Sequence, residues 1–185
     1  MGIVIGIDVG ISTTKIVGII EGSKVLSPIR IKATDPVTSL YGAFGKFLYV
    51  NKIQLQDIEK VMLTGVGSAY INEPIYNLPT EKADEFLADG LGARYETGLS
   101  RMIVVSMGTG TSIVKCDGDD INHIGGIGIG GGTLQGLSRL LLNTDDIKQV
   151  AKLAETGDVS HINVLIKDIS ANPLPGLPMD AIASL

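Results

Sequence analysis

The sequence is poor in cysteine, in tryptophan and in clustered positive charge. The scarcity of cysteine argues against a disulfide or zinc protein, and the lack of clustered positive charge argues against a nucleic-acid-binding protein. It contains one cysteine, Cys116, in 185 residues and no tryptophan. A single cysteine forms no internal disulfide, and no Cys-x-x-Cys pair or cysteine–histidine cluster indicates a zinc site. The 15 lysines and arginines are outnumbered by 20 acidic residues, for a formal charge of −5, and no basic run forms a stripe. Nucleic acid is therefore not expected as a partner.

Long apolar runs are missing as well. No stretch reaches the roughly 18 apolar residues that cross a bilayer. The chain enters a strand-like run at Ile3 without the basic segment of a signal peptide. Hydrophobic residues make up 44% of the chain and charged residues 19%, which is enough to form a core. We therefore expect a cytoplasmic protein with no membrane partner and one good-sized domain.

Glycine is abundant, and its placement is informative. Many of the 24 glycines lie in three clusters, and clustered glycine is typical of backbone that turns tightly or approaches a ligand. Residues 3–20 and 102–116 share one layout, a strand, a glycine turn rich in hydroxyls and a second strand. Because each is a hairpin, the chain does not open with the strand-then-helix unit of a Rossmann domain.

The remaining pattern predicts an α/β fold with a mixed sheet. Asp35 and Pro36 are typical of a helix start, and Pro28 interrupts the strand in which it lies. The predicted helices are 36–50, 82–99, 133–142 and 144–155; the further predicted strands are 24–32, 60–64, 75–78, 102–106, 111–116 and 164–169.

The first candidate site is the turn after the first strand. Asp8 ends that strand, and one or two carboxylates together with phosphate oxygens are what Mg²⁺ prefers. The turn amides, the threonine hydroxyls and the lysine suit phosphate oxygens. An ordinary Asp-Gly hairpin turn is the alternative. The predicted phosphate-binding residues are Gly6, Gly10, Thr13, Thr14 and Lys15.

The second and third candidates are the turn at 106–112 and the glycine run at 125–132. The run leads into a predicted helix, whose N-terminus favours an anion. It is neither a Walker A loop nor a dinucleotide fingerprint, and a loose surface loop is the alternative. The predicted nucleotide-binding residues in these segments are Gly108, Gly110, Thr111, Gly130, Gly131 and Gly132.

A carboxylate that accepts the proton of an alcohol is the remaining requirement of phosphoryl transfer. The segment 81–86 offers Glu81, Asp84 and Glu85, although acids at a helix start also favour the helix dipole. His123 lies just before the glycine run, separated from it by Ile124, which suggests a side chain that faces the ligand. We expect a structural or solvent-exposed role for His161 and a structural one for Cys116.

Five segments together resemble type II pantothenate kinases, a family with the RNase H-like fold of actin and hexokinase. They are GIDVGISTTKIVGI, MLTGVGSA, DEF before GLG, VVSMGTGTSIV and HIGGIGIGGGTLQGLSRLL, and they extend over essentially the whole chain. The GTGTS turn followed by GGxGxGGGxxxGL is quite specific to that family, whereas GIDxG belongs to the wider superfamily. The resemblance implies helices on both faces of the mixed sheet and ATP-dependent phosphorylation of pantothenate, the first step toward coenzyme A.

The resemblance also assigns roles. Asp8 would organise Mg²⁺, the cofactor would be ATP, and Glu85 would be the catalytic carboxylate. The spacing from Glu85 to Gly90 is about two residues shorter than the family pattern, so Glu81 and Asp84 stay open. A homodimer of the full-length form is implied. The residues that would face pantothenate are Thr109, Ser112, Gly126 and His123.

Two departures from the family pattern leave other functions open. His123 stands where the family has a substrate-binding arginine, and an imidazole lacks the bidentate fork of a guanidinium. The family continues into a second lobe, so we expect residues 1–170 to be a phosphate-binding lobe and 171–185 a linker toward a missing lobe. The alternatives are a nucleotide-binding regulatory module, a kinase for a related hydroxy compound, and an ATPase activator like those of 2-hydroxyacyl dehydratases. The single cysteine argues against the activator.

Overall fold

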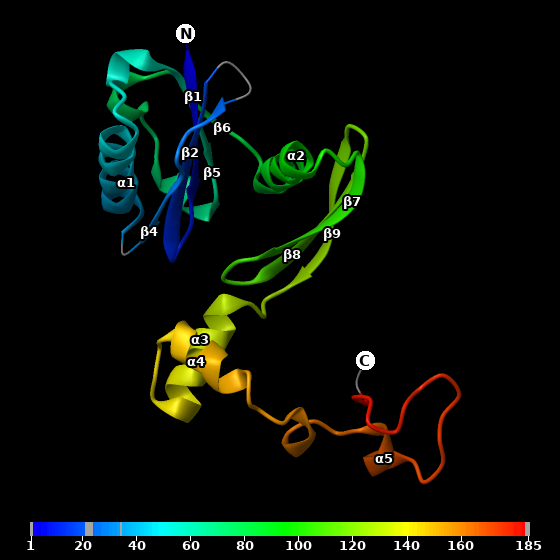
Figure 1. Ribbon diagram of the computed structural model, residues 1–185. Coiled ribbons are helices and arrows are strands. Elements are labelled where there is room, and N and C mark those ends of the chain that lie inside the picture. The colour runs from blue at the N-terminus through cyan, green and yellow to red at the C-terminus, as the bar shows by residue number, and fades with distance from the viewer. Residues whose placement is uncertain (1, 21–23, 34, 184–185) are drawn as a thin grey trace. The chain divides into compact units, whose positions relative to one another are not determined.

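A computed structural model describes residues 2–20, 24–33 and 35–183 (Figure 1). The chain divides into two compact units, Met1–Thr133 and Leu134–Leu185. The first unit contains two β-sheets, and the second is helical with long irregular segments. Within the described residues, no helix is long and apolar enough to cross a membrane.

The first sheet has six strands and is mixed. Its order is β3-β2-β1-β5-β6, with β4 pairing the far edge of β2. The β1–β2 pair is antiparallel, whereas β1–β5 and β5–β6 are parallel, so the predicted mixed sheet is confirmed. The strands are β1 (Ile3–Val9), β2 (Thr13–Ile20), β3 (Lys24–Val25), β4 (Ile29–Lys32), β5 (Ile58–Thr64) and β6 (Thr80–Lys82).

Helix α1 (Pro36–Asn51) covers one face of this sheet (Figure 1). Its start is fixed by Asp35, whose carboxylate accepts a hydrogen bond of 2.7 Å from the backbone N–H of Thr38. Alternate residues of β1 point toward α1 and are buried with Phe44 and Phe47, which are completely inaccessible to solvent. Because side chains alternate along a strand, the intervening residues Gly6 and Asp8 lie on the opposite face, away from this core.

The second sheet of the same unit consists of the antiparallel strands β7 (Arg101–Met107), β8 (Thr111–Asp117) and β9 (Asp120–Ile127). Helix α2 (Glu85–Thr97) packs on it. The contact needs glycine at Gly90, because a Cβ there would lie 2.5 Å from Ile121 Cγ2 and 3.1 Å from Cys116 Sγ. Cys116 is buried beneath the helix.

The second unit begins within helix α3 (Gly131–Leu142), whose first residues belong to the first unit. Asp146 caps helix α4 through the backbone N–H of Lys148. A bridge between Leu165 and Ile182 closes the irregular C-terminal segment. The remaining helices are α4 (Ile147–Ala154), α5 (Ile166–Ile169) and the 3-10 turns η1 (Leu55–Asp57), η2 (Val66–Tyr70), η3 (Ile75–Asn77) and η4 (Val159–His161).

Most predicted elements are confirmed within a few residues, the short strand β6 was not predicted, and three other expectations were wrong or incomplete. Residues 75–77 form the 3-10 turn η3 in place of a strand, and the positive φ values of Tyr76 and Asn77 are incompatible with a strand. Residues 164–169 contain the short helix α5 in place of a strand. The strand β9 was missed because its glycine-rich end resembles a loop. The predicted division into a 1–170 lobe and a 171–185 linker stays a prediction.

Candidate functional site

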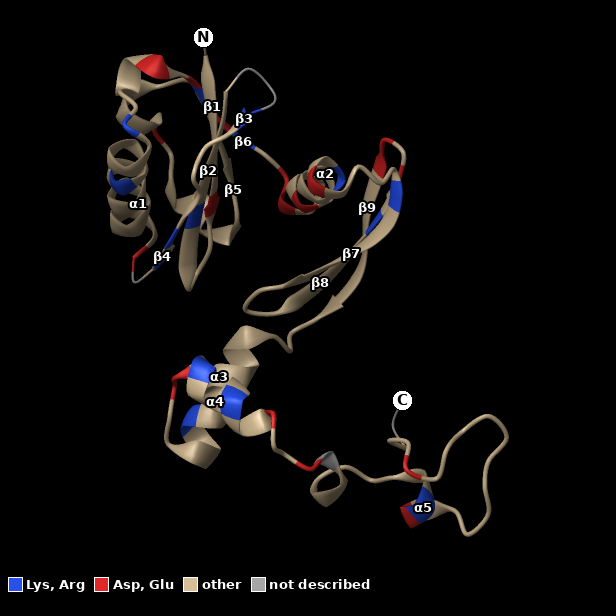
Figure 2. Cartoon of the chain, viewed as in Figure 1, with Lys and Arg blue, Asp and Glu red and all other residues tan. Residues whose placement is uncertain are grey.

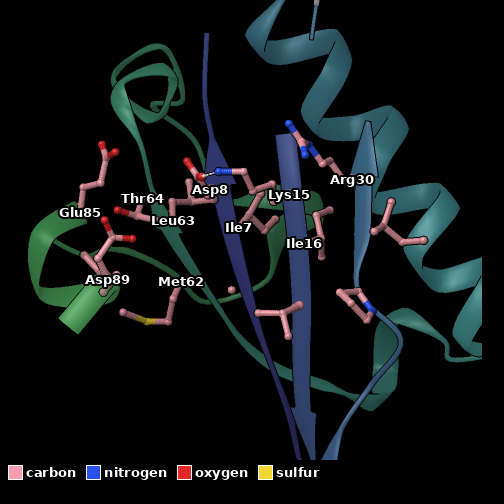
Figure 3. Close-up of a pocket in the computed structure, with 16 residues that line it drawn as sticks. Ile7, Asp8, Lys15, Ile16, Arg30, Met62, Leu63, Thr64, Glu85 and Asp89 are labelled. Carbon is pink, nitrogen blue, oxygen red and sulfur yellow. Dashed lines mark hydrogen bonds and ion pairs between the residues drawn. The ribbon is translucent and has the colours of Figure 1, made fainter. Parts of the chain in front are cut away.

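A row of polar side chains crosses the face of the first sheet that α1 leaves free. The strand register places Asp8 opposite both Thr64 of β5 and Lys15 of β2, and Lys15 opposite Arg30 of β4. Residues in register on neighbouring strands point to the same face. The row thus runs Thr64, Asp8, Lys15, Arg30 along one wall of a cavity of about 450 Å³ (Figure 3).

Asp8 and Lys15 are paired at the centre of this row. The Lys15 ammonium donates to the Asp8 carboxylate at 2.6 Å, and both side chains are partly exposed. Gly65 follows β5 with a φ of +83° and passes so close to Asp8 that a Cβ there would collide with the carboxylate. Lys15 therefore binds the carboxylate on one side, and the lack of a side chain at Gly65 leaves space for the carboxylate on the other.

The turn from β1 to β2 closes tightly. The backbone N–H of Gly10 donates to the carbonyl of Thr13 at 3.0 Å, and a Cβ on Gly10 would lie 2.6 Å from that oxygen. Thr13 is half-buried at the start of β2, whereas Thr14 is completely buried on the core face, and its hydroxyl has no hydrogen-bond partner among the described residues. The side chain of Thr14 therefore does not line the cavity with Lys15.

The second glycine turn and the glycine run pack backbone against backbone. The N–H of Gly131 donates to the carbonyl of Gly108 at 2.8 Å, and that of Gly132 to Thr109 at 3.2 Å. A Cβ on Gly130 would lie 2.6–2.7 Å from three atoms of Gly110, so only glycine fits. The structure brings these predicted residues together, and Gly131 and Gly132 give their amides to the turn.

Thr111 also belongs to this cluster. Its hydroxyl donates to the carbonyl of Ile129 at 2.8 Å, which ties β8 to the glycine run. The two predicted phosphate turns approach each other, since the hydroxyls of Ser12 and Thr109 lie 3.5 Å apart. Two hairpins that are 97 residues apart in the sequence thus present their hydroxyls at one place.

Among the three candidate carboxylates, Glu85 alone lines the cavity. Asp84 is the N-cap of α2 and accepts from the N–H of Leu87 at 2.9 Å. Glu81 forms an exposed ion pair with Lys60 at 2.7 Å. Glu85 is the first residue of α2, and it faces Asp8 across the cavity in Figure 3.

The surroundings of Glu85 favour its protonated form. Burial raises the pKa of the Glu85 carboxyl above its usual value, and the negative charges of Asp8 and Asp89 raise that pKa further, while Lys15 opposes them. A carboxylate with a raised pKa is a better proton acceptor once it is ionised. Figure 2 shows the acidic residues that gather on α2.

Sequence reasoning missed Asp89 and Arg30, both of which line the cavity (Figure 3). Asp89 lies four residues after Glu85 on the same helix, so the spacing of the two acids was the available signal. Arg30 could be assigned to the cavity only from the pairing of β4 with β2, because no sequence motif surrounds it.

His123 is placed by contact with α2. Its ring stacks on Phe86, with centroids 4.1 Å apart and planes inclined by 18°. Gly126 of the same strand faces Ser112 in the β8–β9 register, and a Cβ there would lie 2.6 Å from the carbonyl of Thr111. Of the residues predicted to face the substrate, His123 thus contacts Phe86, which directly follows Glu85 in the chain.

The cavity residues fit Mg²⁺ that is bound together with a nucleotide, and they do not form a metal site of their own. Among the described residues no group of three or more acidic, histidine or cysteine side chains could hold a metal by itself. Asp8 provides one carboxylate at the cavity, and Mg²⁺ commonly takes one or two carboxylates together with phosphate oxygens. The donor set therefore fits Mg²⁺ that arrives with a nucleotide.

The fold is RNase H-like, of the actin and hexokinase type, as the likeness to solved structures shows. Component A of (R)-2-hydroxyglutaryl-CoA dehydratase from Acidaminococcus fermentans matches with a TM-score of 0.69 and 15% identity, over 90% of this chain and 62% of that one. The activator of 2-hydroxyisocaproyl-CoA dehydratase from Clostridium difficile matches with a TM-score of 0.68 and 16% identity, over 89% and 59%. A ROK family protein from Streptococcus pneumoniae matches with a TM-score of 0.53 and 14% identity, over 85% and 68%. At these identities the likeness concerns the fold alone.

Sequence comparison shows which proteins the chain is similar to. The chain is 35% identical to type II pantothenate kinase of Staphylococcus aureus strain USA300, over 97% of its own length. It is 34% identical to the type II pantothenate kinase of the bovine strain RF122. Residues 94–185 match the family described as Fumble. The predicted resemblance to the type II pantothenate kinases is confirmed, and the chain spans 64% of the length of these relatives.

Proposed function

We propose that this protein phosphorylates pantothenate at the expense of ATP, the first step of coenzyme A biosynthesis. The observation that carries the proposal is the common cavity of Glu85 and the Asp8–Lys15 pair. Phosphoryl transfer to an alcohol requires a proton acceptor for the hydroxyl and charged groups that face the phosphates. The likeness to type II pantothenate kinases over nearly the whole chain supports pantothenate as the acceptor.

In the proposed reaction Glu85 accepts the proton of the pantothenate hydroxyl. The hydroxyl oxygen forms a bond to the γ-phosphorus of ATP, and the bond from that phosphorus to the bridging oxygen of ADP breaks. The proton stays on Glu85 until solvent removes it, and ADP leaves with the electron pair of the broken bond. The raised pKa of Glu85 suits this role, because its carboxylate binds a proton more strongly than an ordinary glutamate does.

The phosphates are assigned to the two glycine turns. The hydroxyls of Ser12 and Thr109 and the backbone of the turn at 108–110 converge where the phosphates would lie. Asp8 would hold Mg²⁺ together with the phosphate oxygens, and Mg²⁺ supplies neutralisation of phosphate charge. Lys15 would then be released toward the phosphates. A homodimer remains a prediction from the resemblance, and a cytoplasmic location remains a prediction from the sequence.

A nucleotide-binding regulatory module is the second candidate. His123 favours it, because an imidazole is a weaker carboxylate clamp than the arginine of the family pattern. A kinase for a related hydroxy compound remains compatible with the same cavity. An ATPase activator for a dehydratase is disfavoured, since the one cysteine of the chain is buried under α2.

The test uses the native protein at its natural length, with its intact mass measured on the same sample. ATP is supplied with pantothenate, and product is detected as the mass of the phosphate ester together with an equal amount of ADP. Formation of phosphopantothenate supports the kinase. ATP binding by calorimetry without any phosphorylated product supports the regulatory module instead.

A further inference from the structure

Thr64, the last residue of β5, carries a hydroxyl without a partner. The oxygen of this hydroxyl is shielded from solvent, and among the residues that the structure describes it has no hydrogen bond. Thr64 lines the cavity that also contains Asp8 and Glu85. A buried hydroxyl that is left unpaired is unfavourable, and such groups are rare in folded proteins. We therefore expect a state of the protein in which this hydroxyl finds an acceptor.

The neighbouring strand offers that acceptor. Asp8 of β1 and Thr64 of β5 are register partners, and Figure 3 shows the two side chains next to each other. Neighbouring strands lie about 4.8 Å apart, and a hydroxyl can reach a carboxylate oxygen across this spacing at about 2.7 Å. A small rotation of either side chain is therefore enough to join the two groups.

The two oxygens of the Asp8 carboxylate have different surroundings. Oδ2 accepts a hydrogen bond from Lys15 on β2. Oδ1 lies toward β5, where a Cβ on Gly65 would collide with it, and no described residue donates a hydrogen bond to it. A donor without an acceptor and an acceptor without a donor thus lie on adjacent strands.

The ion pair with Lys15 holds the Asp8 carboxylate toward β2. In the proposed function Lys15 turns to the phosphates, and Asp8 then loses its partner. A hydroxyl can replace the ammonium as hydrogen-bond donor without neutralising the carboxylate. The full negative charge of Asp8 is then available to Mg²⁺, which prefers ionised carboxylates.

We propose that Thr64 is a positioning residue, which donates a hydrogen bond to Oδ1 of Asp8 when Lys15 leaves that carboxylate. This inference rests on the proposed kinase function and names the group that keeps Asp8 in place during the reaction. Thr64 acts through Asp8 and touches neither the nucleotide nor the acceptor. The exchange involves no covalent step, because Asp8 only changes one hydrogen-bond donor for another.

Thr14 provides a matched comparison in the same sheet. Its hydroxyl is also buried, and it too has no partner within the described part of the chain. Thr14 points to the core face, however, whereas Thr64 shares the cavity face with Asp8. If the removal of a buried hydroxyl mattered by itself, both threonines would respond alike.

The test uses the native protein at its natural length and the variants Thr64→Val, Thr64→Ser and Thr14→Val. Valine has the shape of threonine without the hydroxyl, and serine keeps the hydroxyl. ATP binding is measured by calorimetry at increasing Mg²⁺ concentration, and again in EDTA without Mg²⁺. The thermal midpoint is measured without ligand, and the phosphate ester of pantothenate is detected by its mass.

In Thr64→Val the Mg²⁺ concentration that half-saturates ATP binding is expected to rise about tenfold, the lower bound for a hydrogen bond to a charged group. ATP binding without Mg²⁺ is expected to stay unchanged, because Lys15 then remains on Asp8. The midpoint of unliganded Thr64→Val is expected to stay the same or rise, since the hydroxyl that it loses has no partner in that state. Thr64→Ser and Thr14→Val are expected to need as much Mg²⁺ as the wild type.

An unchanged Mg²⁺ requirement of Thr64→Val would overturn the proposal. So would an equal rise in Thr14→Val or in Thr64→Ser, or a lower midpoint of unliganded Thr64→Val. If the requirement rises in Thr64→Val alone but no phosphate ester forms, the kinase function fails and the role of Thr64 stands. If phosphate ester forms and Thr64→Val behaves like the wild type, the kinase stands and the role of Thr64 fails. A wild type that does not bind ATP refutes both.

Discussion

Replacement of Glu85 by glutamine removes the proposed proton acceptor while it keeps the shape of the side chain. General base catalysis contributes about 10²- to 10⁴-fold to rate, which corresponds to roughly 2.7–5.4 kcal/mol of activation free energy. The effect on stability is expected to be small. A carboxylate in the first turn of a helix contributes about 0.3–1 kcal/mol, and relief from the charges of Asp8 and Asp89 acts in the opposite direction.

The two neighbouring acids provide matched controls. Glu81→Gln breaks an ion pair with Lys60 whose glutamate side chain is 60% exposed, and such pairs are worth about 0–1 kcal/mol. Asp84→Asn keeps a side-chain oxygen that can cap α2. Neither control is expected to change kcat, since neither side chain lines the cavity.

The assay follows ADP release with saturating ATP and pantothenate, together with the thermal midpoint of each variant. The expected result is a loss of kcat of at least a hundredfold in Glu85→Gln, with an unchanged midpoint and retained ATP binding. The assignment is refuted if Glu85→Gln keeps kcat within threefold of the wild type. A hundredfold loss in Glu81→Gln or Asp84→Asn would transfer the role to that residue.

Three further outcomes are expected. Asp89→Asn removes a negative charge that raises the pKa of Glu85. Glu85 then stays ionised to lower pH, so the acid limb of the pH profile of kcat is expected to move to lower pH. An acid limb that stays in place or moves to higher pH contradicts this. Gly130→Ala pushes the glycine run away from the turn at Gly110, at a cost of about 1–3 kcal/mol, and calorimetry is expected to show weaker ATP binding. The control Gly92→Ala has open space around its Cβ and is expected to bind ATP like the wild type. Phe47→Ala empties a completely buried site and is expected to cost about 3–5 kcal/mol, read from urea unfolding; a loss below 1 kcal/mol would contradict the described packing.

Much of the first unit was predictable because its elements carry strong local signals. The hairpin strands alternate cleanly, and the Asp35–Pro36 start of α1 has the predicted cap. The predictions failed where the signal was not local. Strand β9 ends in glycines and is held by pairing with β8, which no property of its own residues indicates. Residues 75–78 have the composition of a strand, but their backbone conformation excludes it.

In the candidate site too, features with a local sequence signal were predicted and features that depend on strand pairing were not. Glycine clusters and the acids before α2 were found from the sequence, because turns and helix starts have characteristic residues. The burial of Thr14 and the exposure of Lys15 depend on which face of β2 each residue occupies. The row that joins Lys15 to Arg30 depends on the pairing of β2 with β4. Neither follows from the spacing of residues within one segment.

The tight turn from Gly10 to Thr13 carries a consequence for how this protein tolerates change in length. Because successive side chains of a strand point to opposite faces, one inserted residue in that turn that shifts the register of β2 would move Thr14 to the position of Lys15 and Lys15 to the core-facing position of Ile16. An ammonium would then enter the hydrophobic core, and a methyl-bearing threonine would replace it beside Asp8. Two inserted residues would restore the alternation. The structure therefore constrains whether the number of residues in this loop is odd or even, and that constraint is independent of which side chains the loop carries.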